Sequence, residues 1–168
     1  MTDAPVRTIR AATENDLEAI LALYAETGLD DGELMDIARA RRIFQRLASY
    51  PDYRIYVVTE ADGTISASYA LLIMDNIAHN GRPLSIVEQV AVSASQQGTG
   101  LGTMMMHHAM ECSRALGCYK LGLSSNVKFE RAHAFYDKLG FVRHGFSFHV
   151  DLAPEGVAAP ADSAEGPG

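Results

Sequence analysis

The order of hydrophobic and polar positions divides the chain into helical and extended segments. Helical spacing of apolar residues predicts a helix over residues 17–27, and further helices are expected over the later half of 29–48, over 100–116 and over 128–139. Runs rich in β-branched and aromatic residues predict strands. These runs are residues 6–10, 53–60, 64–74, 84–92, 119–125 and 141–151, and the last run forms one or two strands bent at Gly145.

Turn and cap residues support these boundaries. Asp62-Gly63 lies between two strand runs and predicts a hairpin. Thr13, with the acidic Asp16 three residues later, resembles a capping box before the first helix. Gly117 is placed to end the third helix. The element order is strand, two helices, three strands, helix, strand, helix and strands, which predicts a mixed α/β fold with a strand–helix–strand crossover in its second half.

The size and composition of the chain indicate one globular domain with a tail. It has 168 residues, of which 48% are hydrophobic and 21% charged. We expect a single domain over residues 1–152 and a disordered tail over 153–168, because the tail is composed mostly of Ala, Pro, Gly and acidic residues. No apolar run reaches membrane-spanning length, and the first residues lack the blocks of a secretion signal, so we expect a cytoplasmic protein without a membrane partner.

Charge and cysteine content narrow the function classes. A net charge of −7 argues against generic nucleic-acid binding, which depends on Lys and Arg that neutralise phosphates. The two cysteines, Cys112 and Cys118, do not have the spacing of a metal-binding pair, and no second pair exists. We therefore expect reduced thiols and no metal.

A glycine-rich loop, Gln97-Gly98-Thr99-Gly100-Leu101-Gly102-Thr103, joins the strand over 84–92 to the helix that follows it. The first amides of a helix have no internal acceptor, and the helix dipole adds partial positive charge, so such a loop can bind phosphate without Lys or Arg. The glycine spacing fits neither the dinucleotide fingerprint nor a Walker loop. The sequence thus predicts an anion cradle for a diphosphate, and the alternative is a purely structural turn.

The second half of the chain resembles the GNAT superfamily of acyl-CoA-dependent N-acetyltransferases. Gln97, Gly100 and Gly102 occupy the fixed places of its motif A, Arg/Gln-x-x-Gly-x-Gly/Ala, after a strand over 86–92. Three later segments resemble its motif B, namely residues 123–126, 132–136 and 139–141. The resemblance covers about residues 6–152. It implies a GNAT-like fold, with a mixed, mostly antiparallel, twisted sheet of six to seven strands and about four helices on its faces.

This resemblance also implies acetyl-CoA as the acyl donor. The diphosphate would bind the loop amides, and the pantetheine arm would lie between two strands that splay apart, with a bulge in the first. Asn126 could bond the pantetheine or only cap the next helix, and His133 could face the cofactor or the surface. The implied cofactor-binding residues are Val90, Ala91, Val92, Gln97, Gly98, Thr99, Gly100, Leu101, Gly102, Thr103, Asn126 and His133.

Two residues match the positions of catalytic groups in that family. Glu88 lies on the strand beside the acetyl site and would act as general base, either directly after burial or through an ordered water. The alternative for Glu88 is a half-exposed strand residue or a salt-bridge partner. Tyr136 would donate a proton to the departing CoA thiolate, and its alternative is core packing.

The acceptor is expected to be a small primary amine, such as an amino acid or amino sugar. The segments 117–120 and 124–128 are similar to family members that acetylate amino sugars and aminoalkylphosphonates. Acidic residues in 30–36 could steer a cationic amine or form a solvated face, and arginines in 39–46 could hold a carboxylate or phosphonate. A protein N-terminus or lysine acceptor and a non-catalytic acyl-CoA-binding module remain alternatives. The resemblance favours a homodimer.

Overall fold

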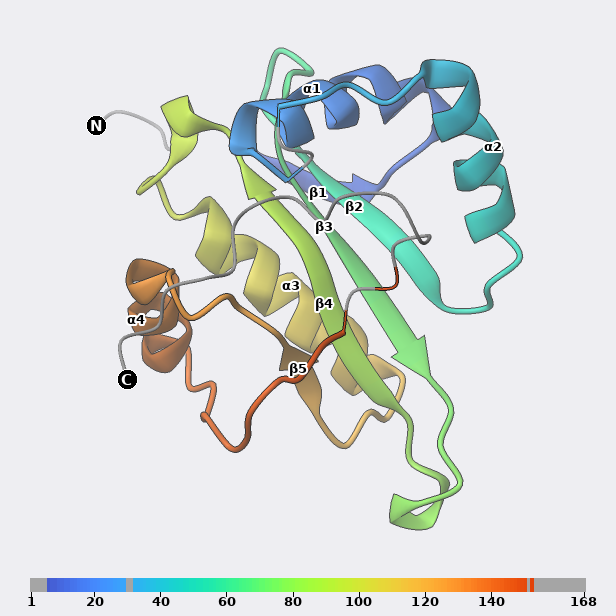
Figure 1. The fold of residues 1–168 in the computed structure, drawn as a ribbon, viewed down its shortest axis with the longest axis vertical. Coiled ribbons are helices and arrows are strands. Elements are labelled where there is room, and N and C mark those ends of the chain that lie inside the picture. The colour runs from blue at the N-terminus through green and yellow to red at the C-terminus, as the bar shows by residue number, and fades with distance from the viewer. Residues whose placement is uncertain (1–5, 30–31, 151, 153–168) are drawn as a thin grey trace. The chain divides into compact units, whose positions relative to one another are not determined.

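The computed structural model describes residues 6–29, 32–150 and 152 (Figure 1). These residues belong to two compact units. The first unit ends at Asn126 and the second begins at Val127. The expected tail, residues 153–168, lies outside the described residues, and so does Asp151 at the end of the last expected strand. The single domain over 1–152 stays a prediction.

A mixed sheet forms the centre of the first unit, and its strands lie side by side in chain order (Figure 1). Neighbouring strands pair antiparallel from β1 to β4, whereas β4 and β5 run parallel and are joined through α3. The mixed, mostly antiparallel sheet and the strand–helix–strand crossover are thus confirmed. The five strands are β1 (Thr8–Ala11), β2 (Tyr53–Thr59), β3 (Ile65–Met74), β4 (Leu84–Val92) and β5 (Leu121–Leu123).

The four expected helices are confirmed. They are α1 (Leu17–Thr27), α2 (Ile37–Leu47), α3 (Leu101–Ala115) and α4 (Glu130–Lys138), and α4 belongs to the second unit. The capping box of Thr13 and Asp16 is present, and it precedes α1 through the short 3-10 turn η1 (Glu14–Asp16). Two further 3-10 turns, η2 (His79–Gly81) and η3 (Ala94–Gln96), precede β4 and α3.

The expected strand count is wrong for the described residues, which form five strands instead of six to seven. Residues 141–150 form no strand, and β5 covers only the middle of the expected 119–125. Alternation of apolar side chains is a local property, whereas a strand exists only where a neighbouring backbone pairs with its N–H and C=O groups. β5 pairs with β4 only from Leu121 to Leu123, and it ends where this pairing ends.

The helices α1 and α3 lie on opposite faces of the sheet, α1 on the near face in Figure 1 and α3 on the far face. On one face, Tyr69 of β3 bonds His108 of α3, with 2.6 Å between the phenol oxygen and Nδ1. Successive strand residues point to opposite faces, so Glu88, which pairs with Ala70, lies on the face opposite Tyr69. The helix α3 is held by a buried row of side chains on that first face, and the row consists of Leu101, Met105, Met106, Ala109 and Ser113.

Candidate active site

A bulge interrupts β4 beside Glu88, as expected from the resemblance. Ser68 pairs with Ala91 and Ala70 pairs with Glu88, so β4 contains one residue more than β3 across this interval. Gln89 occupies the bulge with φ 54°, in the left-handed region that few residues other than glycine adopt. The bulge therefore changes the direction of the chain where the acetyl group is expected.

The β4 edge beyond the bulge is unpaired on one side. The ladder between β4 and β5 ends at Val87 and Leu123. From Glu88 to Val92, β4 has β3 on one side and no strand of the described first unit on the other. Such an edge presents backbone N–H and C=O groups to an extended partner. The expected pantetheine contacts, Val90, Ala91 and Val92, all belong to this segment.

The glycine loop reaches α3 through two residues with positive φ, Gly98 at 78° and Gly100 at 91°. A Cβ at either position would have no atom within 4 Å beyond its own chain neighbours, so glycine is required by the backbone conformation and not by space. The first bond into the helix runs from the Met104 amide to the Gly100 carbonyl, at 3.0 Å. Within the described residues, five amides of the loop donate to no backbone carbonyl, and they are those of Gly98, Gly100, Leu101, Gly102 and Thr103.

The side chains on the loop differ in exposure, since one is buried in the core and two are exposed. Leu101 is 1% exposed, and it anchors the start of α3 in the core. Gln97 and Thr99 are exposed. Of the five residues with unbonded amides, Gly98 and Gly100 are exposed, Gly102 and Thr103 are half-buried, and Leu101 is buried. The loop thus lies partly at the surface, on a helix start that the core holds in place.

Glu88 lies exposed on the face that α1 covers, close to Tyr53. Burial raises the pKa of Tyr53, and the charge of Glu88 raises it further, whereas a hydrogen bond from Gln89 acts in the opposite direction. Tyr24 of α1 donates a hydrogen bond of 3.4 Å to Oε1 of Gln89. The bulge thus brings the carboxylate of Glu88 and the side-chain amide of Gln89 beside the phenols of Tyr53 and Tyr24. The exposed position of Glu88 favours the water-relay form of the expected base over the buried form.

Tyr136 and His133 lie one turn apart on α4, in the second unit, and both are half-buried. Burial raises the pKa of Tyr136, so its phenol is protonated at neutral pH and can donate a proton. Its ring packs edge-on against Phe141, with 5.6 Å between centroids. The N-cap of α4 is Phe129, and Asn126 lies at the end of the first unit, so the structure does not support Asn126 as the cap of this helix.

Comparison with known proteins identifies the family. The model of the Acetyltransferase (GNAT) family matches residues 8–141. The chain belongs to this family. A glucosamine 6-phosphate N-acetyltransferase of Trypanosoma brucei brucei is 33% identical over 161 residues, which cover 90% of this chain and 100% of the relative. An aminoalkylphosphonate N-acetyltransferase of Salmonella typhimurium is 24% identical over 144 residues, 86% of this chain and 90% of the relative.

A solved structure also supports membership of this family. A putative acetyltransferase from Agrobacterium tumefaciens superposes with a TM-score of 0.80 at 30% identity, covering 86% of this chain and 99% of the other. The expected family and fold are confirmed, and this protein is an acetyltransferase, as predicted.

Several residues around this acetyltransferase site were not predicted from the sequence. Gln89 carries no signal, because the left-handed conformation is marked by Gly, Asn or Asp and not by Gln. Arg7, just before β1, bonds Thr99 in the glycine loop and Gln96 before it. Glu26 of α1 bonds Ser93 and Ala94, which precede the loop, and all these bonds join positions at least 67 residues apart. No local pattern can identify such contacts.

The described residues contain neither a candidate metal site nor a candidate membrane-spanning helix. No group of three His, Cys, Asp or Glu side chains in this part of the chain could hold a metal ion. No helix among the same residues combines the length and the apolar character needed to cross a bilayer.

Proposed function

We propose that the protein transfers the acetyl group of acetyl-CoA to the primary amine of a small molecule, by direct attack in a ternary complex. The observation that carries this proposal is the run from Glu88 to Thr103. A bulge, an unpaired strand edge and a loop of unbonded amides follow one another there within one segment. Family membership and the two N-acetyltransferase relatives support the same reaction.

The donor would be held mainly by backbone groups. The diphosphate of acetyl-CoA would accept hydrogen bonds from the amides of 98–103, where the dipole of α3 favours negative charge. The pantetheine arm would pair with the free edge of β4 at Val90 and Val92. A nearby amide would polarise the thioester carbonyl, and backbone donors of this kind stabilise the oxyanion that develops during attack.

The reaction needs two proton transfers. The amine nitrogen attacks the thioester carbon, the carbon–sulfur bond breaks, and the new amide nitrogen loses a proton. Glu88, exposed beside the bulge, would take that proton through an ordered water. The protonated phenol of Tyr136 would supply a proton to the CoA thiolate.

The acceptor we propose is a small amine that also carries a phosphate or phosphonate group. Glucosamine 6-phosphate and aminoalkylphosphonates, the substrates in the names of two relatives, share a primary amine and a phosphorus oxyanion. The arginines at 39, 42 and 46 are exposed on α2 and could contribute to binding this anion. Two of the acidic residues expected to steer the amine, at positions 30 and 31, lie outside the described residues.

Release of the CoA thiol from acetyl-CoA tests the proposal with a matched panel of amines. Glucosamine 6-phosphate should be acetylated with a higher kcat/KM than glucosamine, and 2-aminoethylphosphonate faster than ethanolamine. Faster turnover of a peptide N-terminus or lysine would contradict the small-molecule acceptor. Binding of acetyl-CoA by calorimetry, without turnover of any amine, would indicate a non-catalytic module instead.

A further inference from the structure

We propose that Arg7 positions the loop that receives the diphosphate of acetyl-CoA. The inference rests on the proposed function, because it concerns the same loop. Arg7 lies just before β1, remote in sequence from the loop, and it acts through the loop and not on the cofactor. It is therefore a positioning residue.

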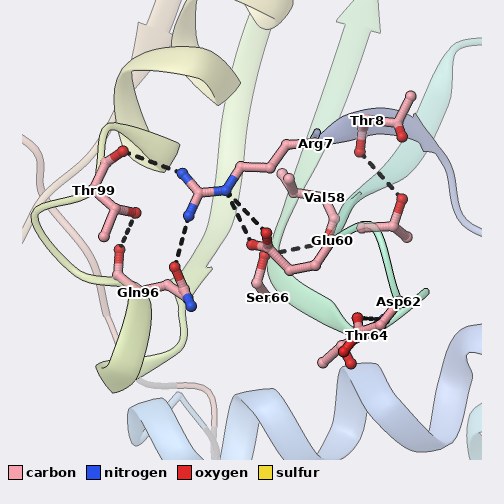
Figure 2. Close-up of polar contacts among 10 residues, drawn as sticks. Arg7, Thr8, Val58, Glu60, Asp62, Thr64, Ser66, Gln96 and Thr99 are labelled. Carbon is pink, nitrogen blue, oxygen red and sulfur yellow. Dashed lines mark hydrogen bonds and ion pairs between the residues drawn. The ribbon is translucent and has the colours of Figure 1, made fainter. Parts of the chain in front are cut away.

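The Arg7 guanidinium is bonded on three sides, as Figure 2 shows. Its Nε donates to both carboxylate oxygens of Glu60, each at 3.1 Å. Nη1 donates to the Thr99 carbonyl at 3.2 Å, and Nη2 donates to Oε1 of Gln96 at 2.7 Å. Only 13% of the Arg7 side chain and 17% of the Glu60 side chain are exposed. Glu60 thus holds one edge of a planar fork whose other edge faces the loop.

The contact with Thr99 determines where an adjacent amide points. The Thr99 carbonyl and the Gly100 N–H belong to one peptide plane, and in a trans peptide these two bonds point in opposite directions. Because Arg7 binds the carbonyl, the Gly100 N–H is directed away from Arg7. Gly100 is the N-cap of α3, so this amide belongs to the group that would bind the diphosphate.

Arg7 bonds both ends of the turn over residues 96–99, through Gln96 at its start and Thr99 at its end. The Thr99 hydroxyl donates to the Gln96 carbonyl at 2.7 Å, and this bond closes the turn between them (Figure 2). Before the turn, Glu26 accepts from the Ala94 amide at 2.8 Å and from the Ser93 hydroxyl at 3.0 Å. Without Arg7, Ser93 and Ala94 would stay attached to α1 and the Thr99 hydroxyl would still close the turn, but the turn would lose both of its bonds to Arg7.

Replacement Arg7→Met tests this role, because methionine fills similar space without donors. We expect about tenfold weaker binding of CoA by calorimetry and a similar rise in KM for acetyl-CoA, since two charge-assisted bonds to the loop are lost. kcat should change less than about twofold, because the reacting atoms are not displaced. The CoA affinity of Arg7→Lys should lie between those of Arg7→Met and the unmodified protein, because a lysine keeps the positive charge but loses the planar guanidinium fork.

A truncated donor separates positioning from a general structural role. S-acetylpantetheine carries the thioester but no diphosphate, so its kcat/KM should be the same in Arg7→Met and in the unmodified protein. Equal losses with both donors would overturn the proposal, and so would CoA binding that Arg7→Met leaves unchanged. Should Arg7→Met not fold, Arg7→Lys is judged by the same two measurements.

Arg10→Gln provides the matched control. Arg10 lies in the edge strand β1, three residues after Arg7, and forms an ion pair with Asp16 at 2.7 Å, but the structure gives it no contact with the loop. Arg10→Gln should lower the melting temperature without weakening CoA binding. Weaker CoA binding in this variant would also count against the proposal. If the unmodified protein binds no CoA, the proposed function fails first, and that result is distinct from failure of the Arg7 role.

Discussion

Asp16, at the start of α1, makes the stability of the fold dependent on pH. Its carboxylate accepts two hydrogen bonds from Arg10, both 2.7 Å, and two from Thr13, at 2.7 and 3.0 Å. The hydrogen bond from Arg10 lowers the pKa of Asp16 from its ordinary value of 3.8 to about 2, although burial acts in the opposite direction. The carboxylate is therefore charged in the folded protein down to a lower pH than in the unfolded chain.

The size of this contribution follows from the pKa. A lowering from 3.8 to about 2 corresponds to about 2.4 kcal/mol of the free energy of unfolding, at about 1.36 kcal/mol for each pH unit. Water screens the pair, because 43% of the Arg10 side chain is exposed, so we expect about 1 to 2 kcal/mol. Since the folded pKa is the lower one, this stabilisation is present above about pH 5 and is lost as the pH falls from about 4 to 2.

Urea unfolding of Asp16→Asn, followed by circular dichroism at pH 7, 5, 4 and 3, measures the contribution of the Asp16 charge to the free energy of unfolding. Asparagine is close in shape but cannot carry the charge. The variant should be less stable than the unmodified protein by the expected amount at pH 7, and the difference should shrink by pH 3. Glu18→Gln, which changes an exposed acid on the same helix, should leave the free energy of unfolding unchanged. A difference that is as large at pH 3 as at pH 7 would refute the charge-based reasoning.

Three further predictions concern the proposed reaction. Tyr136→Phe should lower kcat by about 10- to 100-fold while the KM for acetyl-CoA stays within about twofold, and steady-state kinetics with an unchanged kcat would remove its role as proton donor. Glu88→Gln should lower kcat by about 100-fold in steady-state kinetics at pH 7, because no side chain then takes the proton from the attacking nitrogen, and an unchanged kcat would contradict a base. Gly100→Ala should weaken CoA binding in calorimetry, because φ at this position is 91° and a side chain there costs about 1 kcal/mol, whereas normal affinity would mean that the cradle lies elsewhere.

Much of the fold could be predicted from local patterns. The expected helix over 17–27 and the strand over 84–92 have the same bounds as α1 and β4. Both are long, periodic segments bounded by caps or turns, so neighbouring residues alone contain the signal. The glycine loop could also be predicted from the sequence, because the positive φ of Gly98 and Gly100 requires glycine, and glycine is identified by residue type alone.

The sequence alone therefore determined the order of the elements up to α4 and the family, and it predicted the segment that would hold the cofactor. Only the tertiary structure decided where strand pairing stops, and with it that β4 has a free edge after Val87 and that residues 141–150 form no strand. It also decided that Arg7 bonds the loop, that Glu26 bonds the residues before the loop, and that Gln89 occupies the bulge. These features depend on hydrogen bonds between residues far apart in the chain, which appear in no local periodicity.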